Sequence, residues 1–294
     1  MADESSKIPE KTVEQIFDER YPLDKWEDSN YSILDKFSMR GRKGFVTGAA
    51  GGLGRNAAAA LAQAGADVAL VDLPSQEDKL TELAKDMSER FGTNVIALTC
   101  DVTNVEQVAE LKTQLVEQLG TVDFAFLNAG VNVPGDDQDA TEEVWTRTIN
   151  INLNGTYRTG RIAHEIMREH DHGGSLIFTA SLSGHNANYM MGSPTPVNAY
   201  GATKAAIMEH SRYLAAALAK DGIRSNTISP GYVWSGIFNG RIDMPGHDAM
   251  LEVVPMHRFG TNDEIASTVL FLASDASSYV TGIDIRVDGG YSVF

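Results

Sequence analysis

The chain has 294 residues, of which 43% are hydrophobic and 22% charged, so it carries enough apolar side chains to bury a large core. Its 40 acidic and 24 basic residues give a net charge of −16, which disfavours binding to nucleic acid or to anionic lipid. The single cysteine, Cys100, excludes an intrachain disulfide, and neither a membrane span nor a signal peptide is visible. We therefore expect a soluble, cytoplasmic protein.

The first forty residues differ from the rest, because they carry charges and scattered aromatic side chains without a regular period. Large aromatic residues such as Tyr21 and Trp26 are costly to leave in water, which argues against a wholly flexible tail. We expect residues 20–40 to pack on the body of the protein or on a neighbouring subunit, with about the first dozen residues mobile. Residues 1–40 are thus assigned as an N-terminal extension and residues 41–294 as one domain.

From Gly44 onward, apolar runs of strand length alternate with amphipathic runs of helix length. Strands are predicted at 45–47, 68–71, 95–99, 124–127, 175–179, 225–228 and 283–287. Helices are predicted at 53–64, 76–90, 105–119, 141–170, 198–220 and 262–273. This alternation predicts an α/β protein: a single doubly wound Rossmann-type domain with a mainly parallel sheet of about seven strands. The stretch 231–257, rich in Gly, Pro and Met, is predicted to be irregular and to cover a substrate site.

The first predicted strand runs directly into a glycine-rich turn, which ends where the first predicted helix begins. Glycines in such a turn permit a tight bend, close approach of a pyrophosphate, and close packing of helix on strand. The helix N-terminus then offers unpaired N–H groups and a positive dipole end to the phosphates. A glycine-rich turn that binds nothing is the alternative, but its position favours a dinucleotide site. The predicted contacts are Gly48, Gly51, Gly52, Leu53 and Gly54.

Asp72 ends the second predicted strand, where a carboxylate can accept hydrogen bonds from the ribose hydroxyls of a cofactor. The same charge would repel a 2′-phosphate, and neither Arg nor Lys stands at 49–52 or 73–76 to bind one. The residues therefore favour NAD(H) over NADP(H). An ordinary turn or cap residue is the alternative for Asp72.

Further motifs follow in a fixed order: Asp101-Val102, Leu127–Gly130, Pro230–Ser235 and Val287–Gly290. With the turn at Thr47–Gly54, they make the chain resemble the short-chain dehydrogenase/reductase family from about residue 38 onward. Leu127 stands where the family has Asn, and Ser235 where it usually has Thr. The resemblance implies a homo-oligomer, usually a tetramer, that acts on a small molecule. It also implies cofactor contacts from Asp101, Val102, Asn128, Ala129, Gly130, Pro230, Gly231, Val233 and Ser235, besides Tyr200 and Lys204.

Tyr200 and Lys204 stand four residues apart in a predicted helix, so their side chains share one face. Alcohol–ketone interconversion needs a group that takes and returns a proton, and a tyrosine with a pKa of about 10 is a poor base near neutrality. We expect the Lys204 ammonium and an oxidised nicotinamide to lower the pKa of Tyr200. A lone Tyr–Lys pair at this spacing is weak evidence, and the surrounding motifs strengthen it.

Two more residues complete the predicted catalytic set. Ser181 follows the fifth predicted strand, and its hydroxyl is suited to hold the substrate oxygen beside Tyr200. Ser183 competes for this role, but the family's spacing to Gly184 favours Ser181. Asn152 matches the family's fourth catalytic residue, which implies a bent helix and a proton relay to Lys204. Its competitors by residue type are Asn150 and Asn154.

No metal site is predicted. The run His170–His172 is interpreted as a helix end whose imidazoles interact with the dipole, and Cys100 as a small core residue. His185 lies near the expected site, either as a substrate contact or as an ordinary loop residue.

The substrate is less determined than the chemistry. Residues 32–38 and 181–185 resemble the polyol dehydrogenases and sorbose reductases of the family, and a polyol and its ketose are the preferred substrate pair. Hydroxyl partners would come from Asn186, Asn188, Ser193, Thr195 and Asn198. Trp234 and several methionines (Met190, Met191, Met244, Met250 and Met256) favour an apolar secondary alcohol such as a hydroxysteroid. A remote alternative is an NAD-binding regulatory protein without catalysis. The expected substrate contacts are Ser181, Ser183, His185, Tyr200 and Trp234.

Overall fold

The computed structural model describes residues 32–170, 173–188, 196–235 and 247–293. The chain divides into two compact units, residues 1–36 and residues 37–294. Most of the N-terminal extension, residues 1–31, lies outside the described residues, and a 3-10 helix spans Ile33–Phe37. Met39 belongs to the second unit, because its side chain is fully buried and its N–H donates to the carbonyl of Ala64 at 2.9 Å.

The second unit contains a parallel sheet, which has seven strands in the described part of the chain. They are β1 (Lys43–Thr47), β2 (Asp67–Asp72), β3 (Val95–Thr99), β4 (Phe124–Leu127), β5 (Gly174–Thr179), β6 (Ile223–Pro230) and β7 (Asp284–Val287). Their order is β3-β2-β1-β4-β5-β6-β7, and every neighbouring pair is parallel. The chain reverses its direction of travel across the sheet between β1 and β4. Ligands of such folds bind in the crevice at the carboxyl ends of the strands beside this switch.

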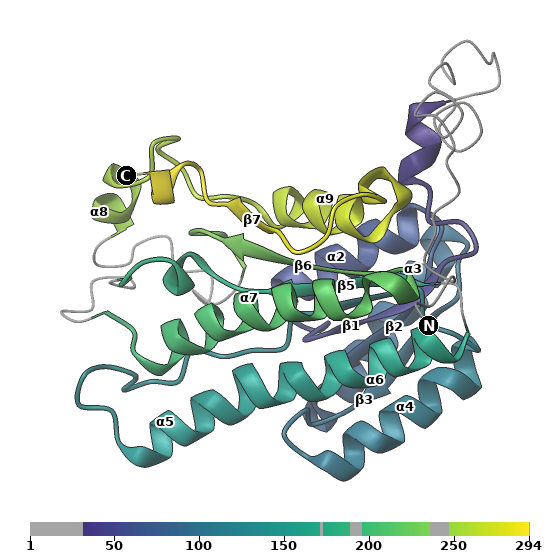
Figure 1. The fold of residues 1–294 in the computed structure, drawn as a ribbon, viewed down its shortest axis with the longest axis horizontal. Helices are drawn as coiled ribbons and strands as arrows, with labels where there is room; N and C mark the ends of the chain where they lie inside the picture. The colour runs from purple at the N-terminus through teal and green to yellow at the C-terminus, as the bar shows by residue number, and fades with distance from the viewer. Residues whose placement is uncertain (1–31, 171–172, 189–195, 236–246, 294) are drawn as a thin grey trace, which may run out of the picture. The chain divides into compact units, whose positions relative to one another are not determined.

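Helices cover both faces of the sheet (Figure 1). Their bounds are α2 (Gly52–Gln63), α3 (Glu77–Phe91), α4 (Val105–Leu119), α5 (Glu142–Ile149), α6 (Thr156–Glu169), α7 (Ala199–Leu218), α8 (His247–Glu252) and α9 (Asn262–Ala273). One core cluster joins the sheet to α2, α3 and α9, and the other joins it to α4, α6 and α7. The prediction of a doubly wound α/β domain is therefore confirmed. None of the described helices combines the length and the apolarity needed to cross a membrane.

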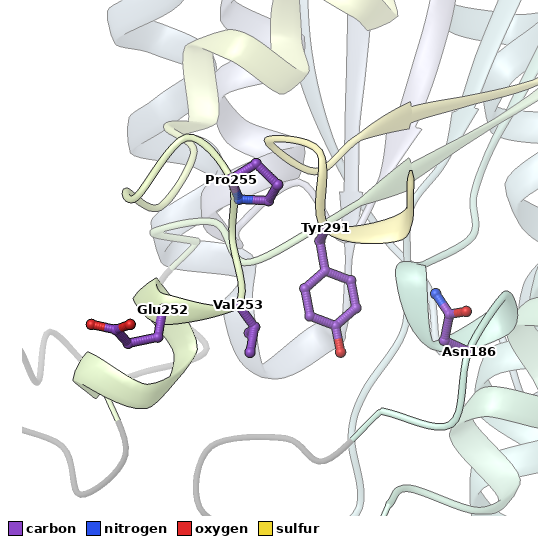
Figure 2. A pocket seen from close by; sticks show the side chains of 5 residues that line it. All are labelled: Asn186, Glu252, Val253, Pro255 and Tyr291. Atoms are coloured by element: carbon purple, nitrogen blue, oxygen red, sulfur yellow. The ribbon is translucent and has the colours of Figure 1, made fainter. Parts of the chain in front are cut away.

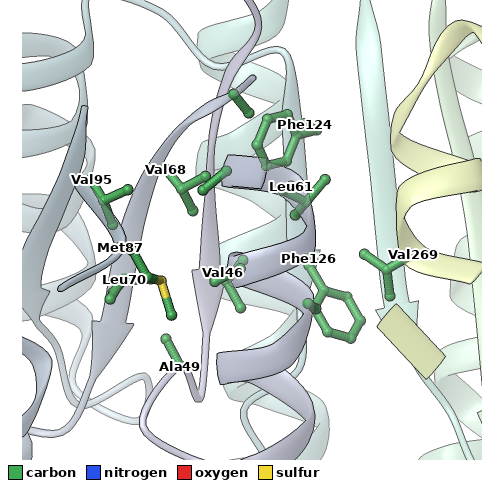
Figure 3. Close-up of a cluster of buried hydrophobic side chains, with 14 of the residues drawn as sticks. Val46, Ala49, Leu61, Val68, Leu70, Met87, Val95, Phe124, Phe126 and Val269 are labelled. Carbon is green, nitrogen blue, oxygen red and sulfur yellow. The ribbon is translucent and has the colours of Figure 1, made fainter. Parts of the chain in front are cut away.

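The strands at the centre of the sheet, such as β1 and β4, are buried almost along their whole length because helices cover both of their faces. Phe45 and Val46 are adjacent in β1, yet they belong to opposite clusters, since successive strand side chains point to opposite faces. Figure 3 shows the cluster on the α2 side, which includes Val46 and Leu70 of the sheet and Leu61 of α2. This packing holds the carboxyl ends of the strands rigidly beneath the loops that carry the site.

Two predicted elements differ from the observed ones. The single helix expected at 141–170 is interrupted by a π-helical stretch at Asn150–Gly155, between α5 and α6. The stretch 231–257, expected to be irregular, contains the short helix α8, and a bridge pairs Val233 with Gly260. Part of that stretch, residues 236–246, lies outside the described residues.

Candidate active site

The glycine-rich turn lies between β1 and α2, at the carboxyl end of the sheet. A methyl group on Gly54 would lie 2.2 Å from the carbonyl oxygen of Gly48, and one on Gly52 would lie 2.2 Å from the carbonyl oxygen of Ser235. Both positions therefore require glycine. The N-cap Gly51 is extended, and within the described chain no side chain caps the first turn of α2. The N–H groups of this turn are thus available to a phosphate, so the residues present fit a dinucleotide.

Asp72 supports the same turn from the end of β2. Its Oδ2 accepts a hydrogen bond from the N–H of Ala50 at 2.9 Å, and its Oδ1 accepts one from the N–H of Leu73 at 2.8 Å. Asp72 therefore does stabilise the turn, which is the alternative that the sequence left open. Each carboxylate oxygen keeps further lone-pair capacity, so ribose hydroxyls remain possible partners.

Asn128 connects the ends of three strands. Its amide nitrogen donates to the carbonyl of Thr47, and its Oδ1 accepts from the hydroxyl of Thr179 at 3.2 Å. The backbone N–H groups of Asn128 and Ala129 both donate to the hydroxyl of Thr47, at 2.9 and 3.0 Å. Leu127, which departs from the family motif, is 1% exposed and lies in the core, so the departure leaves these polar contacts intact.

The other predicted cofactor residues lie in loops at the same edge. Asp101 holds its loop by accepting from the N–H and the hydroxyl of Thr103, at 2.9 and 2.7 Å, and Val102 is buried against Gly155. The N–H of Gly231 donates to the carbonyl of Val287 at 3.0 Å, which ties the segment after β6 to the end of β7. The contact between Ser235 and Gly52 then brings this segment to the glycine-rich turn.

Lys204 and Tyr200 lie on one face of α7. The ammonium nitrogen of Lys204 is 5.5 Å from the centre of the Tyr200 ring, and it donates to the carbonyl of Thr179 at 2.7 Å. Lys204 is 3% exposed, and burial lowers its pKa to about 8. The carbonyl of Thr179 was not singled out by the sequence, because a backbone acceptor has no sequence signal.

The side chain of Ser181 lies close enough to the Tyr200 phenol to lower its pKa. The residue as a whole is partly exposed, but enough protein surrounds the phenol oxygen for burial to raise its pKa above the usual value. The interaction with Ser181 opposes this rise without cancelling it. In the protein without cofactor the pKa is therefore raised, because withdrawing a phenolate from water costs more than this contact returns. The lowering expected from Lys204 together with an oxidised nicotinamide stays a prediction.

Asn152 lies in the π-helical stretch and is fully buried. Its Oδ1 accepts from the N–H of Val131, and its Nδ2 donates to the carbonyl of Val131, both at 2.8 Å. A methyl group on Gly130 would lie 3.0 Å from Asn152 Oδ1 and 3.5 Å from Lys204 Nζ, so both side chains converge beside Gly130. The structure therefore brings together the residues predicted to be catalytic, and their roles remain predictions.

The competing residues are engaged elsewhere. Asn154 donates to Asn150 at 3.2 Å, so these two amides pair with each other. The hydroxyl of Ser183 accepts from Asn188 at 3.0 Å, and the Oδ1 of Asn188 accepts from the hydroxyl of Tyr232 at 2.9 Å.

Two of the predicted substrate contacts, His185 and Trp234, have partners within the protein itself. His185 Nε2 lies 2.9 Å from Asp284 Oδ2 and 3.2 Å from the hydroxyl of Ser229, so it ties its loop to β6 and β7. The Trp234 ring packs on Phe259, with 4.8 Å between ring centres. Ser193, Thr195, Met190, Met191 and Met244 lie outside the described residues.

A cavity of about 530 Å³ lies beside the loop that follows Ser181. It is lined by Asn186, Glu252, Val253, Pro255 and Tyr291, and Figure 2 shows the Tyr291 ring between Val253 and Asn186. Of these only Asn186 was expected. Glu252 and Tyr291 were missed because they come from the stretch after β6 and from the end of the chain. In the described residues no cluster of His, Cys, Asp or Glu could hold a metal ion, and Asp171 and His172 lie outside them.

In the comparisons with known proteins, the matches described below are all named as reductases or dehydrogenases. The family model described as enoyl-(acyl carrier protein) reductase matches residues 48–292. A sorbose reductase from Schizosaccharomyces pombe is 40% identical over 261 residues, covering 88% of this chain and 99% of the relative. An NADP-dependent mannitol dehydrogenase from Alternaria alternata is 36% identical, covering 89% and 96%. The crystal structure of a short-chain type dehydrogenase/reductase from Mycobacterium marinum is 35% identical and superposes with a TM-score of 0.83, covering 90% of this chain and 100% of that one.

Proposed function

Because the chain belongs to the short-chain dehydrogenase/reductase family of oxidoreductases, we propose that it interconverts a secondary alcohol and a ketone with Tyr200 as acid and base. One observation carries this proposal: the Tyr200 phenol lies beside Ser181, and the Lys204 ammonium lies 5.5 Å from the centre of its ring. Asn152 and the glycine-rich turn lie at the same edge of the sheet.

Each side chain has a separate task in this reaction. The hydroxyl of Ser181 holds the substrate oxygen next to the phenol of Tyr200. Tyr200 takes the proton of the alcohol during oxidation and returns it during reduction. Lys204 stabilises the phenolate through its charge, which offsets the effect of burial on the pKa of Tyr200. When bound, the nicotinamide would supply the redox step by exchanging a hydride with the substrate carbon.

For the substrate we propose a polyol and its ketose. The relatives named sorbose reductase and mannitol dehydrogenase support this class. The cavity supports it as well, because the Asn186 amide, the Glu252 carboxylate and the Tyr291 phenol are partners suited to several hydroxyl groups. Val253 and Pro255 add an apolar wall against which the carbon face of a sugar can pack.

Turnover of a substrate panel tests this proposal. Polyols with their ketoses are assayed beside hydroxysteroids and simple secondary alcohols, each with NAD and with NADP. Fast turnover of a polyol is the expected result. Turnover of apolar alcohols alone would instead support the alternative substrate, a hydroxysteroid or a similar apolar alcohol that packs against Trp234. If NADH binds but no member of the panel is turned over, the polyol assignment is wrong and the result favours a cofactor-binding regulator.

We propose NAD(H) as the cofactor, on the basis of Asp72. Relatives named NADP-dependent mannitol dehydrogenase point to the other cofactor. The proposal of NAD(H) therefore depends on this chain's own residues. We expect Asp72→Asn to raise the ratio of kcat/KM with NADP to kcat/KM with NAD about tenfold, since it removes a charge and keeps the acceptor for Ala50. The matched control is Asp67→Asn at the other end of β2, which removes the same charge beside Asn94. Equal ratios in the two variants, or a wild type that prefers NADP, would refute the assignment.

The buried Lys204 predicts a pH dependence for ketone reduction. Its pKa of about 8 means that the ammonium is present below pH 8 and is lost as the pH rises through that value. Without this charge the phenolate left after proton donation is not stabilised, so we expect kcat/KM to fall above about pH 8. In Lys204→Arg the charge persists at high pH, so this limb should disappear at a lower absolute rate. A limb unchanged in that variant would assign the titration to another group.

We also propose that the protein works in the cytoplasm as a homo-oligomer, a tetramer. The exposed rings of Tyr157 on α6 and Tyr213 on α7 support a contact surface on these helices. Sedimentation of the purified protein measures the number of subunits.

A further inference from the structure

The loop that follows β4 contacts two of the predicted catalytic residues and the helix that carries a third. Both backbone polar groups of Val131 bond to the side chain of Asn152. Five residues later, the carboxylate of Asp136 accepts from the N–H of Ala199 at 2.7 Å and from the N–H of Tyr200 at 2.8 Å. The loop therefore spans from Asn152 to the start of α7, although neither Val131 nor Asp136 was singled out by the sequence.

The start of α7 depends on this external contact. The first N–H groups of a helix have no partner within the helix, and a side chain at the N-cap usually supplies one. Here the N-cap residue, Asn198, does not cap α7, and its amide donates instead to the carbonyl of Asp137 at 3.1 Å. Asp136 uses one carboxylate oxygen for each of two N–H groups. Its negative charge also complements the positive end of a 20-residue helix, and at 7% exposure solvent screens it little.

We propose that Asp136 is a positioning residue for Tyr200, an inference that rests on the proposed function of the site. Tyr200 is the second residue of α7, in the turn that frays first when a cap is lost. Lys204 lies one turn further on and is held separately by the carbonyl of Thr179. Fraying would therefore move the phenol away from Ser181 while the ammonium stays in place. A displacement of about 1 Å is enough to lower a catalytic rate strongly.

Removing the carboxylate tests the proposal. In Asp136→Ala we expect kcat to fall by roughly 10- to 100-fold, while the dissociation constant for NADH stays within about threefold of wild type. The limb of the rate–pH profile that reports Tyr200 as a base should also move, because displacement of the phenol changes both its burial, which raises its pKa, and its contacts with Ser181 and Lys204, which lower it. In Asp136→Asn one acceptor oxygen remains, so its kcat should lie between those of the wild type and the alanine variant.

A matched control separates positioning from stability. Asp123 is another buried carboxylate, 8% exposed, and it accepts from the N–H of Lys43 at 2.7 Å at the amino ends of the strands. Asp123→Ala should lower Tm at least as much as Asp136→Ala, by several degrees, and keep kcat and its pH profile. If both variants lose kcat in proportion to their loss of Tm, Asp136 is merely structural and the proposal is wrong.

A second measurement needs no substrate, so it distinguishes this inference from the proposed function. Hydrogen exchange of the Ala199 and Tyr200 amides should be faster in Asp136→Asn than in wild type, with later α7 amides unchanged. If Asp136→Ala does not fold, this measurement and the kcat of Asp136→Asn decide the question. Unchanged exchange at both amides would overturn the capping role, whatever reaction the protein catalyses. Faster exchange together with a wild-type kcat and pH profile would overturn the positioning role.

Discussion

Tyr200→Phe is expected to lower kcat by about a thousandfold or more while the protein still binds NADH. Removing the phenol oxygen deletes the group that exchanges a proton with the substrate, and general acid–base catalysis contributes about 10² to 10⁴ in rate. The ring remains, so the packing at the start of α7 is retained. Steady-state kinetics with the best substrate of the panel measures the loss, and fluorescence titration measures the affinity for NADH.

Tyr213→Phe is the matched control for this prediction. Tyr213 lies on the same helix, but its ring is exposed and belongs to the proposed contact surface between subunits, away from the site. Phenylalanine keeps that ring and removes only the phenol oxygen, so kcat should remain that of the wild type. A Tyr200→Phe variant with normal turnover would show that the proton comes from another group, and the mechanism assigned to Tyr200 would be wrong.

Gly52→Ala is expected to weaken cofactor binding by about 100-fold or more. The added methyl group would lie 2.2 Å from the carbonyl oxygen of Ser235, 2.7 Å from its carbonyl carbon and 3.1 Å from its Cα. These are backbone atoms, which cannot rotate away, so the turn and the segment after β6 must separate. Both segments belong to the predicted cofactor site, and a shift of either removes contacts worth several kcal/mol together.

Gly51→Ala provides the comparison. At this position the methyl group would meet only the carbonyl oxygen of Gly48, at 3.3 Å, so the fold should be retained with a Tm close to wild type. Any loss of NADH affinity in Gly51→Ala then reports obstruction of the phosphate, whereas Gly52→Ala should lose both Tm and affinity. A Gly52→Ala protein with wild-type Tm and affinity would show that the turn is less tightly packed than the structure indicates.

The pattern of apolar residues was sufficient to predict the strands and most of the helices. Parallel strands read as apolar runs because they are buried on both faces, whereas helices show the longer amphipathic period. The run Phe124–Leu127 is entirely apolar and became β4, and the amphipathic stretch 105–119 became α4 with the predicted bounds. The interruption at Asn150–Gly155 could not be predicted in this way. A π-helical stretch adds a residue to one turn without changing the polarity of the segment, so it leaves no mark on the apolar pattern. Its consequence is visible only in the structure, where the side chain of Asn152 in this stretch bonds to the backbone of Val131.

The spacing of residues along the chain was sufficient to predict which residues of part of the candidate site lie together. Tyr200 and Lys204 are joined by local helix geometry, and the glycine-rich turn by the direct passage from β1 to α2. The burial that raises the pKa of Tyr200 in the protein without cofactor has no sequence signal, because burial depends on what the rest of the chain places around the phenol. In the same way, the sequence did not show that His185 would pair with Asp284, which is 99 residues away.

The sequence by itself determined the fold class and the family, since each follows from local pattern or from motifs in order, and it predicted which residues exchange a proton. Only the tertiary structure decided how those residues are supported. Asp136 meets Ala199 across 63 positions of sequence, and Tyr291 reaches the cavity from the end of the chain. Such contacts have no periodicity, because they arise where crossover connections bring the carboxyl ends of β4, β5, β6 and β7 to one edge of the sheet.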